Sequence, residues 1–252
     1  MSRDLSRRDL LAGTGAALGA AIVGVAVAPK AGGQSFGKAP TRWGMAIDLG
    51  RCAGQSGCRR CIEACHAAHR VPAVADPRHE VKWVWKEPFA RVFPEQVHPY
   101  QTEERRQSPV LVLCNHCKNA PCTRVCPTSA TWRRSDGVVA MDEHRCIGCR
   151  YCLTACPYGA RSFNWEEPDS PATSNYPART AGVVEKCTLC VERLDVGQIP
   201  LCVETCQRAG MAALTFGNLE DASSPLRQLL ATRSVLRRRP ELGTEPSVFY
   251  LA

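Results

Sequence analysis

The sequence is poor in aromatic residues, and beyond its first 28 residues it has no apolar stretch long enough to span a membrane. Phe, Trp and Tyr make up 6% of the 252 residues, whereas the chain has 19 Gly and 18 Pro. It also lacks a Gly-rich phosphate loop, a dinucleotide-binding fingerprint and a nucleophile elbow. We therefore expect a loop-rich fold with no catalytic site of its own.

Cysteine is what the chain has in excess, with 16 residues. Cys146, Cys149, Cys152 and Cys156-Pro157 follow the spacing C-x2-C-x2-C-x3-C-P, which is typical of [4Fe–4S] ligands in bacterial ferredoxins. In that arrangement the first three thiolates bind one cluster, and the fourth cysteine binds the neighbouring cluster. Pro157 suits the first turn of a helix, where its missing N–H costs little.

The remaining cysteines form three more motifs of four. A short apolar run, Asp, two residues, Arg and Cys precede both Cys52 and Cys146, so the motif is repeated within the chain. The first motif has five residues between Cys52 and Cys58, where two are usual, which leaves the ligand role of Cys52 open. The motifs consist of Cys52, Cys58, Cys61 and Cys65; of Cys114, Cys117, Cys122 and Cys126; and of Cys187, Cys190, Cys202 and Cys206.

Exchange of the fourth cysteine between partner motifs predicts which residues share a cluster. The second and third motifs are adjacent and pair with each other, which leaves the first and fourth to pair across the sequence. The sequence thus predicts four [4Fe–4S] clusters, with all sixteen cysteines as iron ligands. The predicted sets are Cys52, Cys58, Cys61 and Cys206; Cys187, Cys190, Cys202 and Cys65; Cys114, Cys117, Cys122 and Cys156; and Cys146, Cys149, Cys152 and Cys126.

A structural module held by zinc or disulfides is the remote alternative. Zinc sites usually consist of two separated C-x2-C pairs or include histidine ligands, and disulfides do not require this spacing. The formal net charge of +8 comes from dispersed Lys and Arg residues. We expect these cations to offset anionic clusters, and we expect no nucleic-acid partner.

The predicted fold class is α+β, with two ferredoxin-like units, each holding two [4Fe–4S] clusters and related by pseudo-symmetry. We expect strands at 44–48, 108–113, 138–141 and 211–216, a hairpin turn at Asp136-Gly137, and a basic amphipathic helix over 225–239. Residues 81–89 alternate as in a half-buried strand, with a docking surface as the alternative. The expected segments are the first motif with an insertion (42–113), the central unit (114–165), the fourth motif (166–220) and a C-terminal tail (221–252).

Residues 1–28 carry paired arginines, Arg7-Arg8, followed by a weakly apolar Ala/Gly-rich run. This pattern resembles a twin-arginine (Tat) export signal, and an uncleaved membrane anchor is the alternative. Residues 29–41 are a Gly/Pro/Lys linker in which we expect little order. Export by the Tat route would carry a folded, cluster-loaded protein to the periplasm.

Four such motifs behind a Tat-type segment resemble the iron–sulfur subunits of dimethyl sulfoxide reductases and polysulfide reductases, over nearly the whole chain after residue 28. Softer stretches resemble the DsrO subunits of DsrMKJOP complexes, namely Glu80–Glu95, Ala160–Asn164, Gly182–Cys187 and Pro240–Tyr250. This resemblance implies a periplasmic electron-transfer subunit in dissimilatory sulfur metabolism. The implied partners are a quinone-interacting membrane subunit (DsrP-like), a multihaem cytochrome c (DsrJ-like) and other Dsr subunits. The alternative is the electron-transfer subunit of a periplasmic molybdopterin oxidoreductase.

Overall fold

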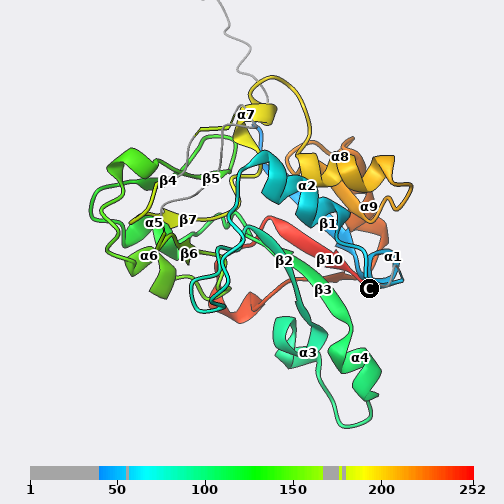
Figure 1. The fold of residues 1–252 in the computed structure, drawn as a ribbon. Helices are drawn as coiled ribbons and strands as arrows, with labels where there is room; N and C mark the ends of the chain where they lie inside the picture. The colour runs from blue at the N-terminus through cyan, green and yellow to red at the C-terminus, as the bar shows by residue number, and fades with distance from the viewer. Residues whose placement is uncertain (1–39, 55–56, 167–175, 178–179) are drawn as a thin grey trace, which may run out of the picture. The chain divides into compact units, whose positions relative to one another are not determined.

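A computed structural model describes residues 40–54, 57–166, 176–177 and 180–252 (Figure 1). The predicted signal segment and most of the predicted linker lie outside these residues. Short helices and short strands alternate along the described chain, and the predicted mixture of the two is confirmed.

The largest sheet joins the two ends of the described chain. Its strands lie in the order β8-β1-β10-β9. Strand β1 pairs in parallel with β10, with Ala46 opposite Phe249, and antiparallel with β8, with Ala46 opposite Thr215. The bounds are β1 (Trp43–Asp48), β8 (Leu214–Asn218), β9 (Val235–Leu236) and β10 (Val248–Leu251).

Three antiparallel pairs of strands make up the rest of the sheet structure. The pairs are β2 (Val84–Pro88) with β3 (Pro109–Leu113), β4 (Thr131–Arg133) with β5 (Val139–Met141), and β6 (Ser162–Phe163) with β7 (Val184–Glu185). The predicted turn at Asp136-Gly137 lies between β4 and β5, and Gly137 adopts the positive φ of +86° that such turns favour.

The helices are short, and several start at a proline. Pro121 and Pro225 begin α5 and α9, where a missing N–H costs little, and the Asp48 carboxylate caps α1 by accepting from the Arg51 N–H at 2.9 Å. The α-helices are α1 (Leu49–Ala53), α2 (Arg60–Ala68), α3 (Phe89–Val92), α4 (Glu103–Gln107), α5 (Pro121–Arg124), α6 (Tyr151–Thr154), α7 (Val191–Leu194), α8 (Leu201–Arg208) and α9 (Pro225–Thr232). Single 3-10 turns are η1 (Pro94–Gln96), η2 (Glu143–Arg145) and η3 (Pro240–Leu242).

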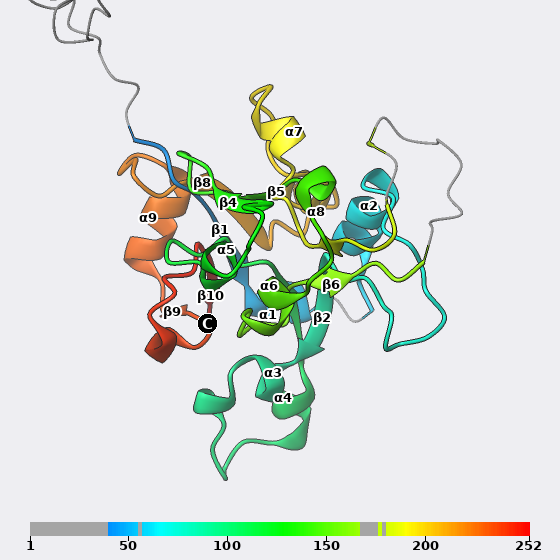
Figure 2. The same ribbon diagram turned by 90° about the vertical axis from the view of Figure 1, so that its left-hand side faces the viewer.

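Helices from distant parts of the sequence pack side by side. Helix α2 packs against α8, and α5 packs against α6 (Figures 1 and 2). Helix α9 packs on β8 and β1 through the fully buried Leu226. In both views α3 and α4 lie at the far end of the β2–β3 pair, away from α5, α6 and α8.

The hydrophobic core is continuous with the cysteines. Trp83, Phe93 and Tyr250 are at most 1% exposed and belong to the same cluster of buried residues as Cys65, Cys117 and Cys202. Trp83 directly precedes β2, so the interpretation of residues 81–89 as a half-buried strand is confirmed.

Two predicted elements differ from the structure. The helix predicted over 225–239 ends at Thr232, because Val235 and Leu236 pair with β10 instead. The strand predicted over 211–216 starts at Leu214, which pairs with Ile47 of β1, and extends to Asn218. In both cases pairing with a distant strand overrides the local pattern.

Candidate metal centres

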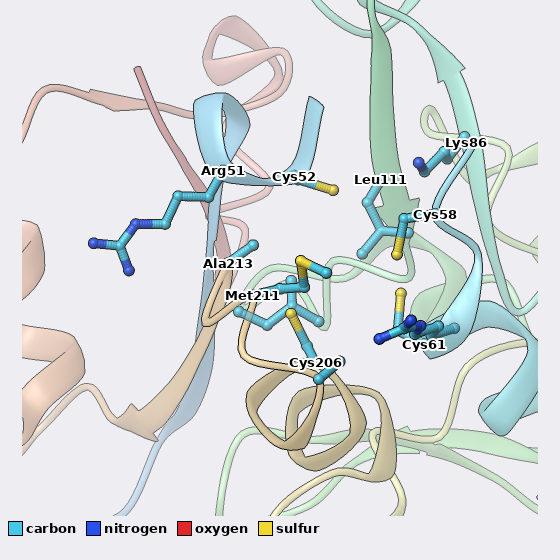
Figure 3. A pocket seen from close by; sticks show the side chains of 12 residues that line it. Arg51, Cys52, Cys58, Cys61, Lys86, Leu111, Cys206, Met211 and Ala213 are labelled. Carbon is cyan, nitrogen blue, oxygen red and sulfur yellow. The ribbon is translucent and has the colours of Figure 1, made fainter. Parts of the chain in front are cut away.

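The first group of cysteines, site A, consists of Cys52, Cys58, Cys61 and Cys206. These residues line one cavity, and in Figure 3 their sulfur atoms point toward one another. Cys52 comes from α1, Cys61 from α2 and Cys206 from α8. The longer gap after Cys52 therefore does not keep its sulfur away from the other three. Arg51, Arg60 and Lys86 also line this cavity, although the Arg51 side chain points away from the sulfurs in Figure 3.

Site B consists of Cys114, Cys117, Cys122 and Cys156, which line a second cavity. Cys114 and Cys117 lie in the loop after β3, Cys122 lies in α5, and Cys156 follows α6. The C-terminal segment holds the loop in place. The Lys118 N–H donates to the Glu245 carbonyl at 3.0 Å, and the Ser247 N–H donates to the Asn115 carbonyl at 2.9 Å.

Site C consists of Cys126, Cys146, Cys149 and Cys152, which line a third cavity. Gly148 lies between two of these cysteines with a φ of +67°. A Cβ atom at this position would lie 2.3 Å from the Gly182 carbonyl oxygen, so the close approach of these backbones requires glycine.

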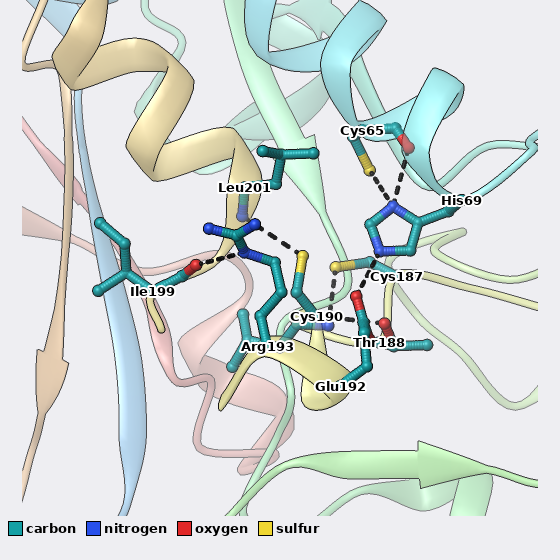
Figure 4. A network of polar contacts seen from close by, with 10 residues as sticks. Cys65, His69, Cys187, Thr188, Cys190, Glu192, Arg193, Ile199 and Leu201 are labelled. Carbon is teal, nitrogen blue, oxygen red and sulfur yellow. Dashed lines mark hydrogen bonds and ion pairs between the residues drawn. The ribbon is translucent and has the colours of Figure 1, made fainter. Parts of the chain in front are cut away.

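Site D consists of Cys65, Cys187, Cys190 and Cys202, which are all buried (Figure 4). Helices α2 and α8 pack together and carry Cys65 and Cys202, respectively. Burial raises the pKa of Cys202 well above its ordinary value, and Cys190, Cys187 and Cys65 raise it further because they lie close by. The structure thus brings together the same four groups that exchange of the fourth cysteine predicts.

The sites follow one another in the order A, D, B, C. Electrostatic coupling between thiols identifies the neighbours, since Cys61 of site A raises the pKa of Cys202 in site D. In the same way Cys114 of site B raises the pKa of Cys187 in site D, and Cys122 of site B raises that of Cys152 in site C. Half-buried cysteines are concentrated at the two ends of this row, namely Cys52 and Cys58 in site A and Cys126, Cys146 and Cys149 in site C.

The metal-free thiols resist ionisation because they are buried together. Burial and then repulsion from the other site A thiolates raise the pKa of Cys61 to about 12, and burial followed by Cys114 raises that of Cys117 to about 12. Four thiolates in one such cavity require cations between them. The donor set of each site therefore fits a [4Fe–4S] cluster, whose insertion would release protons. None of the sixteen cysteines, all in the described residues, forms a disulfide.

One backbone feature recurs that the spacing alone did not predict. The residue before the second cysteine of every motif has positive φ: Gly57 (+73°), His116 (+42°), Gly148 (+67°) and Leu189 (+60°). This conformation turns backbone N–H groups toward sulfur, with Gly148 donating to Cys146 at 3.5 Å and Leu189 to Cys187 at 3.4 Å. Such donors stabilise thiolates and tune cluster potentials. Only the two glycines gave a sequence signal for it.

His69 is a further site residue that sequence reasoning missed. Its side chain is 2% exposed, and Nε2 donates to the Glu192 carboxylate at 3.0 Å. Nδ1 donates to the Cys65 carbonyl at 2.8 Å and lies 3.6 Å from Cys65 Sγ (Figure 4). Burial alone would lower the pKa of His69, but contacts with Cys190, Cys65 and Glu192 raise it, so the ring carries a positive charge beside site D.

Comparison with known proteins defines the class. Residues 110–217 match the family described as "4Fe-4S dicluster domain", and the chain belongs to this family of iron–sulfur subunits.

Similarity to curated relatives covers nearly the whole chain. The "Hdr-like menaquinol oxidoreductase iron-sulfur subunit 1" of Archaeoglobus fulgidus is 39% identical over 272 residues, which cover 98% of this chain and 97% of the relative. The "Putative dimethyl sulfoxide reductase iron-sulfur subunit" of Halobacterium salinarum is 36% identical, over 84% and 79%. A tetrathionate reductase subunit of Salmonella typhimurium is 35% identical, over 100% and 90%.

These relatives confirm the broad resemblance to iron–sulfur subunits of reductases and oxidoreductases. Within the described part of the chain, no helix has the length and apolar character needed to cross a membrane.

Proposed function

We propose that this chain is an electron-transfer subunit with four [4Fe–4S] clusters, one each at sites A, B, C and D, and with all sixteen cysteines as ligands. Sites B and C form the central ferredoxin-like unit, and sites A and D form the outer one. The packing of α2 on α8 in the outer unit and of α5 on α6 in the central unit supports this pseudo-symmetric division. The proposed segments are 42–113, 114–165, 166–220 and 221–252.

The observation that carries the proposal is the row of sites in the order A, D, B, C. Neighbouring sites are close enough for their thiols to influence one another. The cysteines are most exposed at the two ends of the row, where partner proteins can approach the outermost sites. This arrangement suits conduction through the protein between two partners.

A bound [4Fe–4S] cluster supplies one-electron transfer without bond making or breaking. The protein positions the thiolates and keeps water from sites B and D, where seven of the eight cysteines are buried. Backbone N–H groups of Leu189 and Leu201 donate to Cys187 and Cys190 at 3.4 and 3.5 Å. In this proposal none of the sixteen cysteines acts as a catalytic nucleophile.

We place the protein in a periplasmic DsrMKJOP-type complex of dissimilatory sulfur metabolism, reached by Tat export. There it relays electrons between a DsrP-like quinone-interacting membrane subunit and a DsrJ-like multihaem cytochrome c. The full-length similarity to a menaquinol oxidoreductase subunit supports a quinol-linked complex. The alternative is a periplasmic molybdopterin oxidoreductase, favoured by similarity to dimethyl sulfoxide and tetrathionate reductase subunits.

Composition of the native complex tests this choice. The tagged chain is purified anaerobically from detergent-solubilised membranes and analysed for haem c, molybdenum and clusters reducible by a menaquinol analogue. We expect haem c, quinol-reducible clusters and no stoichiometric molybdenum. A large subunit with equimolar molybdenum would support the alternative. A complex with neither quinol-reducible clusters nor haem c would contradict the proposal.

A further inference from the structure

Two buried cations border site B. Arg161 is 5% exposed and lines the cavity of site B, and Lys186 is 2% exposed. Neither side chain forms an ion pair with a carboxylate among the described residues. A buried cation without an anionic partner is costly. Both residues therefore imply negative charge on the cysteines around them.

Arg161 lies between sites B and C. Its Nη2 donates to Cys122 Sγ of site B at 3.1 Å and to Thr131 Oγ1 at 2.8 Å. Thr131 and Met141, which Nη1 contacts through Sδ at 3.6 Å, both line the cavity of site C. The guanidinium also lowers the pKa of Cys152 in site C, against a larger effect of burial that raises it. One fixed positive charge thus acts on two adjacent sites.

Lys186 lies between sites B and D. Its Nζ donates to the carbonyl of Val139, which lines site B, and at 2.9 Å to the carbonyl of Cys187 in site D. Although burial would raise the pKa of Cys114 in site B, His116 and Lys186 outweigh it and lower the pKa to about 5. Site B is therefore bordered by a buried cation on each side that faces a neighbouring site.

The cations near the other sites are fewer, paired or solvent-exposed. At site D the charge of His69 is offset by the Glu192 carboxylate. At site A, Arg51 and Arg60 are exposed, and water and salt screen exposed charges more than buried ones. No carboxylate lines the cavity of site B among the described residues, and the buried Arg238 guanidinium stacks on Tyr158, which does line it, at 5.2 Å.

We propose that Arg161 and Lys186 give the centre at site B the highest reduction potential in the row, so that the first electron taken up by the protein resides there. Reduction adds one electron and negative charge to a centre, and a nearby buried cation favours that state. The inference rests on the proposed function, because it requires a [4Fe–4S] cluster at each site. Site B would then be an electron reservoir in the interior of the row.

Redox titration followed by EPR tests this inference on the loaded full-length protein, with dithionite as the reductant. The variants are Arg161→Gln, Lys186→Gln and the charge-conserving Arg161→Lys. The matched control is Arg78→Gln, which removes a guanidinium that is 85% exposed. Iron content is measured first on each variant.

We expect Arg161→Gln and Lys186→Gln each to lower the reduction equilibrium constant of the first EPR signal to appear by about tenfold or more, or about 59 mV for one electron. Each substitution also lowers a second signal, and the second signals differ because Arg161 borders site C and Lys186 borders site D. Arg161→Lys and Arg78→Gln leave the first signal near its original potential.

A first signal that keeps its potential in both Gln variants at full iron content overturns the inference. If Arg161→Gln loses iron, Lys186→Gln decides, and an unchanged first signal in that variant is again contrary. Failure of the proposed function gives a different result, since the unsubstituted protein would then show no reducible iron–sulfur signal.

Discussion

Gly148 illustrates how a single residue can decide whether a cysteine loop closes. The loop of site C needs a φ of +67° at this position and a backbone contact with Gly182 that leaves no room for a side chain. At the equivalent positions, His116 and Leu189 adopt the same left-handed conformation with a side chain present. The glycine is therefore required at site C by the close contact more than by the φ angle.

Gly148→Ala should lower the iron content of the protein. The left-handed conformation costs alanine about 1–2 kcal/mol, and its Cβ would also lie 2.3 Å from the Gly182 oxygen. Gly159→Ala is the matched control, because Gly159 has a φ of +61° with no atom within 4 Å of the added Cβ. Iron per chain should fall for Gly148→Ala and stay full for Gly159→Ala, and equal iron in the two variants would refute the role of the contact.

Tyr250 is fully buried, and its hydroxyl has no hydrogen-bond partner among the described residues. Burial raises its pKa to about 12, whereas an unfolded tyrosine has a pKa of about 10. The neutral form is thus favoured in the folded state. Its contribution to stability is complete below about pH 10 and is lost as the pH rises toward about 12.

Tyr250→Phe should therefore be neutral or stabilising by about 1 kcal/mol at neutral pH, because it removes an unpaired buried hydroxyl. It should also extend stability to higher pH. The measurement is the pH between 9 and 12 at which the visible absorbance of the loaded protein is lost. Tyr100→Phe, at a side chain 93% exposed, should leave this pH unchanged. A Tyr250→Phe protein that loses absorbance at lower pH would show that the hydroxyl has a stabilising partner.

At the scale of elements, the C-terminal strand connects two cysteine sites. Strand β10 pairs in parallel with β1, which leads through α1 to Cys52 of site A. The residues just before β10 bond the loop of site B, where Ser247 donates from Oγ to the His116 carbonyl at 3.0 Å. The last residues of the chain therefore help to position two of the four sites.

Removal of residues 245–252 should release iron from both site A and site B, because β1 and the loop after β3 each lose their hydrogen-bond partners. A replacement of the same length is the control, with Gly/Ser in place of residues 95–102 between α3 and α4. That segment lies away from the cysteine-bearing loops in both views of the fold. Iron per chain should fall only in the truncated protein, and full iron after truncation would disprove the supporting role of β10.

For the whole molecule, the sequence predicted which cysteines come together and much less of what surrounds them. Thiolate spacing is a local constraint, so the groups at Cys146–Cys156 and Cys114–Cys126 could be read directly. Parallel pairing of β10 with β1 is non-local, and the tail carries no signal of its partner. The same holds for Arg161 and Lys186, whose importance depends on burial between sites, and for Arg233–Arg239, where strand pairing replaced the predicted helix.

The central claim is that sixteen cysteines hold four [4Fe–4S] clusters in one row. Iron and acid-labile sulfide per chain, measured on anaerobically purified protein and followed by EPR after dithionite reduction, test it most directly. We predict about sixteen irons and a complex spectrum from interacting reduced centres. Zinc in place of iron, or metal-free protein with oxidised thiols, would contradict the account.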